Sequence, residues 1–293
     1  MTNGATNASA PIQEPLPTPE DVRTQNRFRE FDLQGKVFAV TGGGRGLGLA
    51  MAEALVEAGA QVHCLDRLSE PDDEFIYAQK HANPAYGGSL HYRCMDVRDA
   101  ENVKETMSRI ADQKQRLDGL LAAAGINHID SAIGHSQNDV NEIMSINYTG
   151  LFICATEAAK QMMKYNCRGT VLLVASISGI IANKGMCAPV YNSSKAAVIQ
   201  LTRSLAMEWG PREKSGKPGI RVNCICPGHV VTKMVEQILE KDPEAQKVWE
   251  GENMLGRLGR PEEFRGAALY LLSDASSFMT GASLIIDGGQ TAW

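Results

Sequence analysis

The chain has 293 residues, of which 43% are hydrophobic and 22% are charged, and its net charge at pH 7 is −5. These values are typical of a globular protein and argue against a nucleic-acid partner, because nucleic-acid-binding proteins are usually basic. No apolar run approaches the roughly 20 residues of a membrane-spanning helix, so we expect no membrane partner either.

Residues 1–30 are rich in Asn, Ala, Thr, Pro and Glu and contain no apolar core. This composition predicts a disordered N-terminal tail and not a secretory signal. A second interpretation of the tail is an arm that contacts another subunit.

Short apolar runs alternate with segments of helical periodicity along residues 31–293. The runs predicted as strands are residues 36–41, 61–66, 90–96, 119–123, 170–175, 220–225 and 284–286. The predicted helices are residues 46–58, 102–116, 138–147, 150–164, 191–208 and 261–272. This order predicts βαβ units and therefore one doubly wound α/β domain, with a parallel sheet covered on both faces.

Two segments are longer than such a domain needs. Residues 67–88 form a polar insertion after the second predicted strand. Residues 229–260 have helical character and carry the large apolar residues Met234, Trp249 and Met254. Because ligands of doubly wound sheets bind at the carboxyl ends of the strands, the second segment is well placed to cover a substrate.

The seven cysteines are an odd number, and no two of them have the C-x-x-C spacing. Several of them lie in apolar runs, which predicts reduced thiols and a cytoplasmic protein. The spacing of His128, His135 and His229 matches no metal-ligand pattern, so we expect no metal site, and we interpret His229 as a loop histidine whose hydrogen bonds are satisfied.

A glycine-rich turn, Thr41-Gly-Gly-Gly-Arg-Gly-Leu-Gly48, follows the first predicted strand and opens the first predicted helix. Glycines let the backbone turn tightly and approach a pyrophosphate, and the helix N-terminus offers free N–H groups to it. The sequence therefore predicts a dinucleotide site here, with a plain flexible turn as the alternative.

Acidic residues end the second and third predicted strands. Asp66 can accept hydrogen bonds from both ribose hydroxyls of an adenosine and would repel a 2′-phosphate, which favours NAD over NADP. Arg45 and Arg67 argue for NADP, since either could meet a 2′-phosphate. Asp96 is placed to hydrogen-bond the adenine or, equally well, to cap a helix.

Tyr191 and Lys195 lie one turn apart on the same face of a predicted helix. The positive charge of the lysine favours the phenolate and so lowers the pKa of the tyrosine, whose reference value is about 10. Such a pair can exchange a proton with an alcohol or a carbonyl. The spacing alone is weak evidence, but together with the upstream glycine turn it is strong.

In combination, these motifs resemble the classical short-chain dehydrogenase/reductase family from about residue 33 to the C-terminus. The matching residues are the turn at 41–48, Asp96, Asn147, Ser176, Tyr191, Lys195, Pro227-Gly228 and Asp287-Gly288-Gly289. The resemblance implies a single Rossmann domain whose seven-stranded parallel sheet has the order 3-2-1-4-5-6-7, and it implies homodimers or homotetramers.

The resemblance also implies roles for single residues. Tyr191 would be the acid/base, Lys195 would lower its pKa and hold the nicotinamide ribose, and Ser176 would hydrogen-bond the reacting oxygen. Asn147 would hold a water in a proton relay through Lys195. The implied cofactor contacts are Thr41, Gly42, Arg45, Gly46, Leu47, Gly48, Asp66, Asp96, Val97, Gly125, Tyr191, Lys195, Pro227, Gly228 and Thr232. Thr232 could instead be the N-cap of a helix.

Two details depart from the common family pattern. Ser178 has the more usual spacing to Tyr191, yet Ser176 ends the fifth predicted strand, so we assign the catalytic serine to Ser176. This arrangement resembles the polyol dehydrogenase and ketose reductase branch, which includes mannitol dehydrogenase and sorbose reductase. The usual Asn-Asn-Ala-Gly after the fourth strand is here Ala122-Ala123-Ala124-Gly125, which puts local hydrogen bonding in doubt but not the chemistry.

The predicted function is hydride transfer between NAD(H), or NADP(H), and a small molecule with a secondary alcohol or ketone, most plausibly a polyol/ketose pair. Asn127, His128, Lys184 and His229 could supply hydrogen bonds to a polyol. A reductase of bulky or aromatic ketones is the first alternative, because the covering segment carries Met and Trp. A nucleotide-sensing protein without turnover is the second alternative, and the intact catalytic set argues against it.

Overall fold

The computed structural model describes residues 28–82, 84–210, 219–241 and 244–293. The predicted N-terminal tail, residues 1–30, lies outside the described residues except for its last three. Among the residues that the structure describes, no helix is both long and apolar enough to cross a membrane.

A seven-stranded sheet with the order β3-β2-β1-β4-β5-β6-β7 forms the centre of the molecule, and all of its pairings are parallel. The fold predicted from the sequence is confirmed. The strands are β1 (Val37–Thr41), β2 (Gln61–Asp66), β3 (Ser89–Cys94), β4 (Gly119–Ala122), β5 (Thr170–Val174), β6 (Arg221–Pro227) and β7 (Ser283–Ile286). Strands β1, β4 and β5 are buried along their whole length, as expected for parallel strands covered on both faces.

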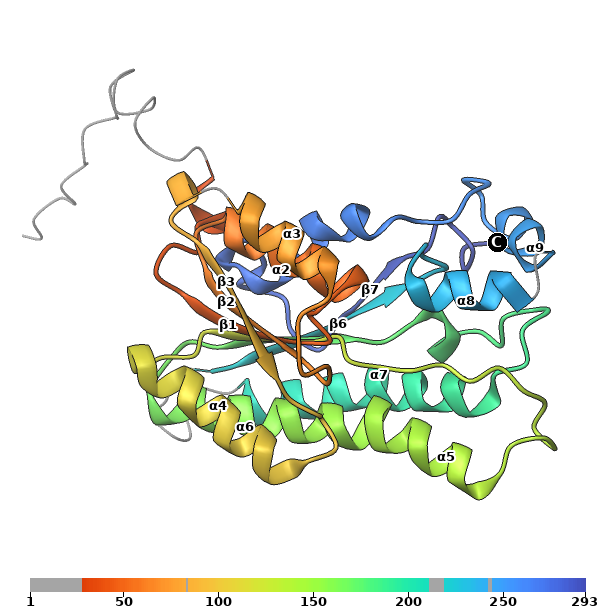
Figure 1. Cartoon of the computed structure of the whole chain (residues 1–293), viewed down its shortest axis with the longest axis horizontal. Helices are drawn as coiled ribbons and strands as arrows, with labels where there is room; N and C mark the ends of the chain where they lie inside the picture. Colours follow the sequence, from red (N-terminus) through yellow and green to blue (C-terminus); the bar gives the residue numbers. More distant parts are fainter. Residues whose placement is uncertain (1–27, 83, 211–218, 242–243) are drawn as a thin grey trace, which may run out of the picture.

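Helices cover both faces of the sheet (Figure 1). One face carries α2 (Gly46–Glu57), α3 (Asp73–His81) and α10 (Arg265–Leu272), and α10 packs on α2. The other carries α4 (Ala100–Lys114), α5 (Gln137–Met144), α6 (Leu151–Lys164) and α7 (Pro189–Trp209). The core accordingly contains two large apolar clusters, one on each side of the sheet, and a smaller third cluster includes Trp249.

The order of the strands reverses at β1, because β1 pairs with β2 on one side and with β4 on the other. At such a switch point the loops after neighbouring strands diverge and leave a crevice at the carboxyl ends of the strands. Two further helices, α8 (Lys233–Lys241) and α9 (Ala245–Gly251), lie at this end of the molecule (Figure 1).

Two features were not predicted from the sequence. The polar insertion at residues 67–88 contains α3, which Asp72 caps by accepting a hydrogen bond from the backbone of Glu74 and which buries Phe75 and Ala78. Helices α5 and α6 are joined by a π-helical turn, Ser145–Gly150, instead of a break. Such π turns are rare and often occur at functional sites, and this one contains Asn147.

Candidate active site

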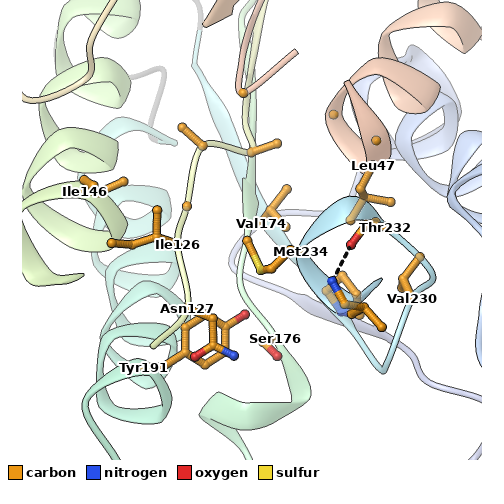
Figure 2. A pocket seen from close by; sticks show the side chains of 18 of the residues that line it. Leu47, Ile126, Asn127, Ile146, Val174, Ser176, Tyr191, Val230, Thr232 and Met234 are labelled. Atoms are coloured by element: carbon orange, nitrogen blue, oxygen red, sulfur yellow. Dashed lines mark hydrogen bonds between the residues drawn. The ribbon is translucent and has the colours of Figure 1, made fainter. Parts of the chain in front are cut away.

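A cleft of about 490 Å³ lies at the carboxyl ends of the strands (Figure 2). The loops after β1 to β6 and the segment with α8 and Trp249 form its walls. Of the residues predicted as site residues, all except Thr41 and Asn147 line this cleft. Figure 2 shows Asn127, Ser176 and Tyr191 toward one side of the cleft and Leu47 and Thr232 toward the other.

The glycine-rich turn between β1 and α2 has a backbone that only glycine permits. Gly42 has a φ of 64°, and a Cβ on it would lie 2.8 Å from the backbone of Ala124. A Cβ on Gly48 would lie 2.2 Å from the carbonyl oxygen of Gly42. The backbone N–H of Gly46, at the start of α2, donates to a carboxylate oxygen of Glu74 at 2.9 Å. This helix N-terminus thus already holds an acidic oxygen, and the turn fits the pyrophosphate of a dinucleotide.

Thr41 is buried, and its hydroxyl accepts a hydrogen bond from the backbone N–H of Ala124 at 3.4 Å. The residue therefore ties the turn after β1 to the segment after β4 instead of lining the cleft. The segment Ala122-Ala123-Ala124 lacks the asparagines that are usual there. The hydrogen bond to the hydroxyl of Thr41, at the end of β1, fixes the backbone of this segment in their place.

Charged residues surround the far end of the cleft, where β2 and β3 end. Asp66 accepts a hydrogen bond from the backbone N–H of Gly44 at 3.2 Å. Arg45 lies 3.4 Å from the carboxylate of Asp72, which also pairs with Lys233 at 2.9 Å. These contacts link the glycine turn, the insertion and α8 across the cleft.

Asp96 has a partner of its own, because Arg98 donates to it from both its backbone and its side chain. The hydrogen bond from the Arg98 side chain is the main cause that holds the pKa of Asp96 below its usual range. The carboxylate therefore stays ionised at this edge of the cleft.

Tyr191 and Lys195 lie in the first turns of α7, and the ammonium nitrogen of Lys195 is 5.6 Å from the centre of the Tyr191 ring. Burial raises the pKa of Tyr191, and a hydrogen bond with Ser176 opposes this rise. Desolvation of the phenol is thus the main influence on this pKa, and its lowering by the charge of Lys195 stays a prediction. Burial also lowers the pKa of Lys195, to about 8, while its ammonium donates to the carbonyl of Val174 at 2.9 Å.

The two candidate serines follow β5 and have different surroundings. Both serines line the cleft, and Ser176 forms a hydrogen bond with Tyr191. Ser178 accepts hydrogen bonds from Ser176 at 3.1 Å and from the amide of Asn183 at 2.5 Å. Because Ser178 is held by these two partners, the geometry favours Ser176 as the group that meets a substrate.

Asn147 is fully buried beneath the cleft and does not line it. Its amide donates to the carbonyl of Ile126 at 2.9 Å and to the hydroxyl of Ser194 at 3.1 Å, and its oxygen accepts from the N–H of Ile126 at 2.9 Å. These bonds join the loop after β4 to α7, so Asn147 holds the two walls of the cleft together.

The residues after β6 close the cleft on its other side. Pro227 and Gly228 line it, and the N–H of Gly228 donates to the carbonyl of Ile286 at 2.9 Å. The hydroxyl of Thr232 accepts from the N–H of Val235 at 3.4 Å (Figure 2). Thr232 therefore both lines the cleft and caps the start of α8, so the two interpretations of this residue are compatible.

Two buried polar atoms of residues that line the cleft have no hydrogen-bond partner among the described residues. They are the side-chain oxygen of Asn127 and the Nε2 atom of His229, and both residues line the cleft. The His229 ring stacks on Trp249 with 4.2 Å between ring centres and 6° between ring planes. Burial lowers the pKa of His229 to about 4, so its imidazole is neutral at pH 7.

The interpretation of His229 as a satisfied loop histidine is therefore wrong. From the sequence, Asn127 and His229 were predicted only as two of several residues that could hydrogen-bond a polyol. The stack of His229 on Trp249 was not predicted, because it depends on how α9 packs against the loop after β6. Met234 and Trp249 line the cleft as expected of the covering segment, whereas Met254 and Lys184 do not. Met186, which was not predicted, lines the cleft.

Comparison with known proteins agrees with this geometry. Residues 42–291 match a family model described as enoyl-(acyl carrier protein) reductase. A short-chain dehydrogenase/reductase of Aspergillus versicolor is 40% identical over 90% of this chain and 89% of its own length.

Several relatives are named for polyols, among them a dehydrogenase of galactitol and one of D-arabinitol. Galactitol 2-dehydrogenase of Rhizobium johnstonii is 37% identical over 90% of this chain and 98% of its own. D-arabinitol 2-dehydrogenase [ribulose-forming] of Scheffersomyces stipitis is 33% identical over 93% of this chain and 100% of its own.

Solved structures show the same fold. A short-chain type dehydrogenase/reductase from Mycobacterium marinum superposes with a TM-score of 0.83 at 34% identity, over 92% of this chain and 100% of its own. A gluconate 5-dehydrogenase from Burkholderia cenocepacia, solved with NADP and tartrate, has a TM-score of 0.81 at 27% identity, over 92% and 100%.

Proposed function

The chain belongs to the short-chain dehydrogenase/reductase family and is an NAD(P)-dependent oxidoreductase that acts on CH–OH groups, and from this premise we propose that its substrate pair is a polyol and the corresponding ketose. The observation that carries the proposal is the pair of unpartnered buried polar atoms, on Asn127 and His229, in the cleft that also holds Tyr191. Such atoms are unfavourable unless a ligand meets them, and a polyol offers a hydroxyl to each. The names of galactitol 2-dehydrogenase and D-arabinitol 2-dehydrogenase among the relatives support the same substrate class.

When bound, the nicotinamide dinucleotide supplies the hydride chemistry. The chain's own residues handle the proton. In ketone reduction Tyr191 donates a proton to the carbonyl oxygen, and the hydroxyl of Ser176 stabilises the charge that develops there. In alcohol oxidation the same groups act in reverse. Lys195 holds the nicotinamide ribose and supplies positive charge beside the tyrosine.

We assign Asn147 a positioning role that is compatible with the proton relay inferred from the family. Its hydrogen bonds fix the loop that carries Asn127 against α7, which carries Tyr191. A proton relay would need a water to reach Lys195 from this loop. A Cβ on Gly125 would lie 3.3 Å from the side-chain oxygen of Asn147 and 3.5 Å from the ammonium of Lys195, so the glycine leaves space between these groups.

The preferred cofactor in this proposal is NAD, with NADP as the alternative. Asp66 brings a carboxylate to the end of β2, where it would repel a 2′-phosphate. Arg45 is partly engaged by Asp72, which reduces its availability to a phosphate. Arg67 lines the cleft and favours NADP, as does the NADP bound in the Burkholderia structure.

The remaining proposals concern assembly and location. Large apolar side chains are exposed on α6 and α7, including Phe152 at 40% and Met207 at 74% exposure. This exposure supports a homodimer or homotetramer built on these helices, which light scattering of the purified protein would test. The free cysteines support a cytoplasmic location, which cell fractionation would test.

The test of the function is nicotinamide absorbance with purified protein, NAD or NADP, and a panel of substrates. We expect turnover of galactitol, D-arabinitol or another polyol and of the matching ketoses, and little turnover of acetophenone or other aromatic ketones. Turnover of aromatic ketones alone would contradict the polyol proposal and favour a tailoring reductase. No turnover of any substrate despite tight cofactor binding would favour a nucleotide-sensing protein.

A further inference from the structure

Two histidines and an aspartate gather outside the cleft, at the start of α5. One ligand atom from each of His128, His135 and Asp139 lies within 4.8 Å of the others. His128 belongs to the loop after β4, His135 precedes the helix, and Asp139 lies in its first turn. The Nδ1 atom of His128 is 3.7 Å from a carboxylate oxygen of Asp139, and the two imidazole rings are 5.1 Å apart between centres.

His135 provides a second and independent observation. Both of its ring nitrogens are buried, and neither has a hydrogen-bond partner among the described residues. A neutral imidazole has one N–H donor and one lone pair, and burial without partners is unfavourable for both. A bound cation would occupy the lone pair.

The third group is held in place by the helix that it begins. One oxygen of Asp139 accepts hydrogen bonds from the backbone and the hydroxyl of Ser136, at 2.8 and 2.7 Å, and forms a capping box. This contact fixes the carboxylate and leaves its other oxygen facing His128.

We propose that His128, His135 and Asp139 form a binding site for a divalent transition-metal ion of the zinc class. Imidazole nitrogen with one carboxylate oxygen is a donor set that suits zinc, whereas magnesium and calcium prefer oxygen alone. Tetrahedral zinc with bonds of about 2.1 Å places its ligand atoms about 3.4 Å apart, so small side-chain rotations bring the three atoms into position. Three protein ligands leave one position for water.

The site would act as a clip on the loop between β4 and α5, which is the loop that carries Asn127 into the cleft. In Figure 1 this loop lies at the same end of the molecule as α8 and α9. Sequence spacing did not indicate the site, because the three residues come together only when the loop folds back on the first turn of α5.

Calorimetric titration of ZnCl₂ into the tag-free protein, first freed of metal with EDTA, tests the site. We expect one zinc ion per chain and no comparable binding of MgCl₂. His128→Ala and His135→Ala should each weaken zinc binding by about 100-fold or more. Loss of a group that only hydrogen-bonds a metal ligand already lowers metal affinity about 10- to 100-fold, and these substitutions remove a ligand itself. His81→Ala is the matched control, because His81 is exposed on α3, where it hydrogen-bonds the carbonyl of Tyr77 and stacks on the Tyr77 ring.

Two controls make the result specific. Asp139 is not substituted, because it caps α5. Thermal unfolding in EDTA should show that His135→Ala folds as well as the parent, since its ring nitrogens have no hydrogen-bond partners among the described residues. Cobalt(II) then identifies the donors, because thiolate ligands give an intense near-ultraviolet band that histidine and aspartate do not. Cys187 is exposed, and its carbonyl accepts from the N–H of Asp130 in the same loop, so it is the thiol to exclude.

Absence of zinc binding would overturn the proposal. So would binding that survives both histidine substitutions, or a cobalt spectrum with a thiolate band that Cys187→Ser abolishes. Because the readout is metal binding and not turnover, the outcome is independent of whether the substrate is a polyol.

Discussion

Replacing His229 by phenylalanine separates the two roles that the structure gives this residue. Phenylalanine keeps a flat ring that can stack on Trp249, now 4.2 Å away between ring centres, and removes the buried Nε2 atom, which has no hydrogen-bond partner in the described part of the chain. A buried polar atom without a partner costs about 1–3 kcal/mol. The free energy of unfolding at pH 7.5 should therefore stay unchanged or rise by up to that amount, although a residue in the active site has been changed.

Substrate turnover should change in the opposite direction. If a polyol hydroxyl hydrogen-bonds to Nε2, His229→Phe removes one neutral hydrogen bond worth about 0.5–1.5 kcal/mol. This loss corresponds to a fall in kcat/KM of about 2- to 13-fold. A ketone without other hydroxyl groups makes no such bond, so its kcat/KM should not fall. Urea unfolding and nicotinamide absorbance with both substrates measure the two effects.

Two matched variants complete the experiment. His229→Ala loses the stack on Trp249 as well as the nitrogen, and should lower stability. His229→Gln keeps a polar end and should recover part of the polyol rate. If His229→Phe lowers turnover of the polyol and of the hydroxyl-free ketone equally, the ring only shapes the cleft, and our interpretation of the unpartnered nitrogen is wrong.

The other predictions concern the cofactor and the proton. Tyr191→Phe should lower kcat about 10²- to 10⁴-fold and leave the Kd of the cofactor nearly unchanged, whereas equal loss of both, by calorimetry and steady-state rates, would refute the assignment. Because burial raises the pKa of Tyr191, the phenol is protonated at neutral pH and ready to donate. Ketone reduction should therefore persist at pH 6–7 while alcohol oxidation, which needs the phenolate, rises toward alkaline pH; an oxidation rate that is flat with pH would contradict this. Asp66→Ala should lower kcat/KM with NAD about 10- to 100-fold, since it removes hydrogen bonds between a charged group and the ribose, and should not lower kcat/KM with NADP. An unchanged ratio of kcat/KM between the two cofactors would show that Asp66 does not select NAD over NADP. Gly48→Ala places a Cβ 2.2 Å from the carbonyl oxygen of Gly42, so the turn must shift. We expect at least about tenfold weaker cofactor binding by fluorescence titration and a loss of stability of about 1–3 kcal/mol, and normal binding would refute the tight fit.

The sheet could be predicted from the sequence because each strand is encoded locally. Buried parallel strands read as short apolar runs between helical segments, and the sheet order then followed from the family resemblance. The glycine turn was also predictable from a short segment of sequence. Gly42 and Gly48 occupy positions where a larger residue would not fit, so the glycines themselves mark the turn. Helix α3 escaped prediction because it buries only two side chains, so its apolar pattern is weak.

The residues proposed for the proton chemistry could be named from the sequence, whereas the effect of burial on their pKa values could not. The spacing of Tyr191 and Lys195 places them on one helical face, and the structure keeps them there. The pKa of the tyrosine, however, depends on how deeply the fold buries it, which no spacing reveals. Burial raises the pKa of Tyr191 and lowers that of Lys195 to about 8, so both groups shift toward their neutral forms.

The two ends of the cleft differ in how the chain encodes them, and this difference explains what the sequence could not predict. The glycine turn at the proposed cofactor end is built from backbone atoms of one short segment, so a local motif suffices to recognise it. The substrate end is built from side chains that approach from separate elements, namely Asn127 after β4, His229 after β6 and Trp249 in α9. Whether a polar atom there has a partner is decided only by the assembled fold. The atoms of Asn127 and His229 that have no partner among the described residues are therefore the strongest evidence about the substrate that the chain itself contains, and they favour a ligand that carries further hydroxyl groups.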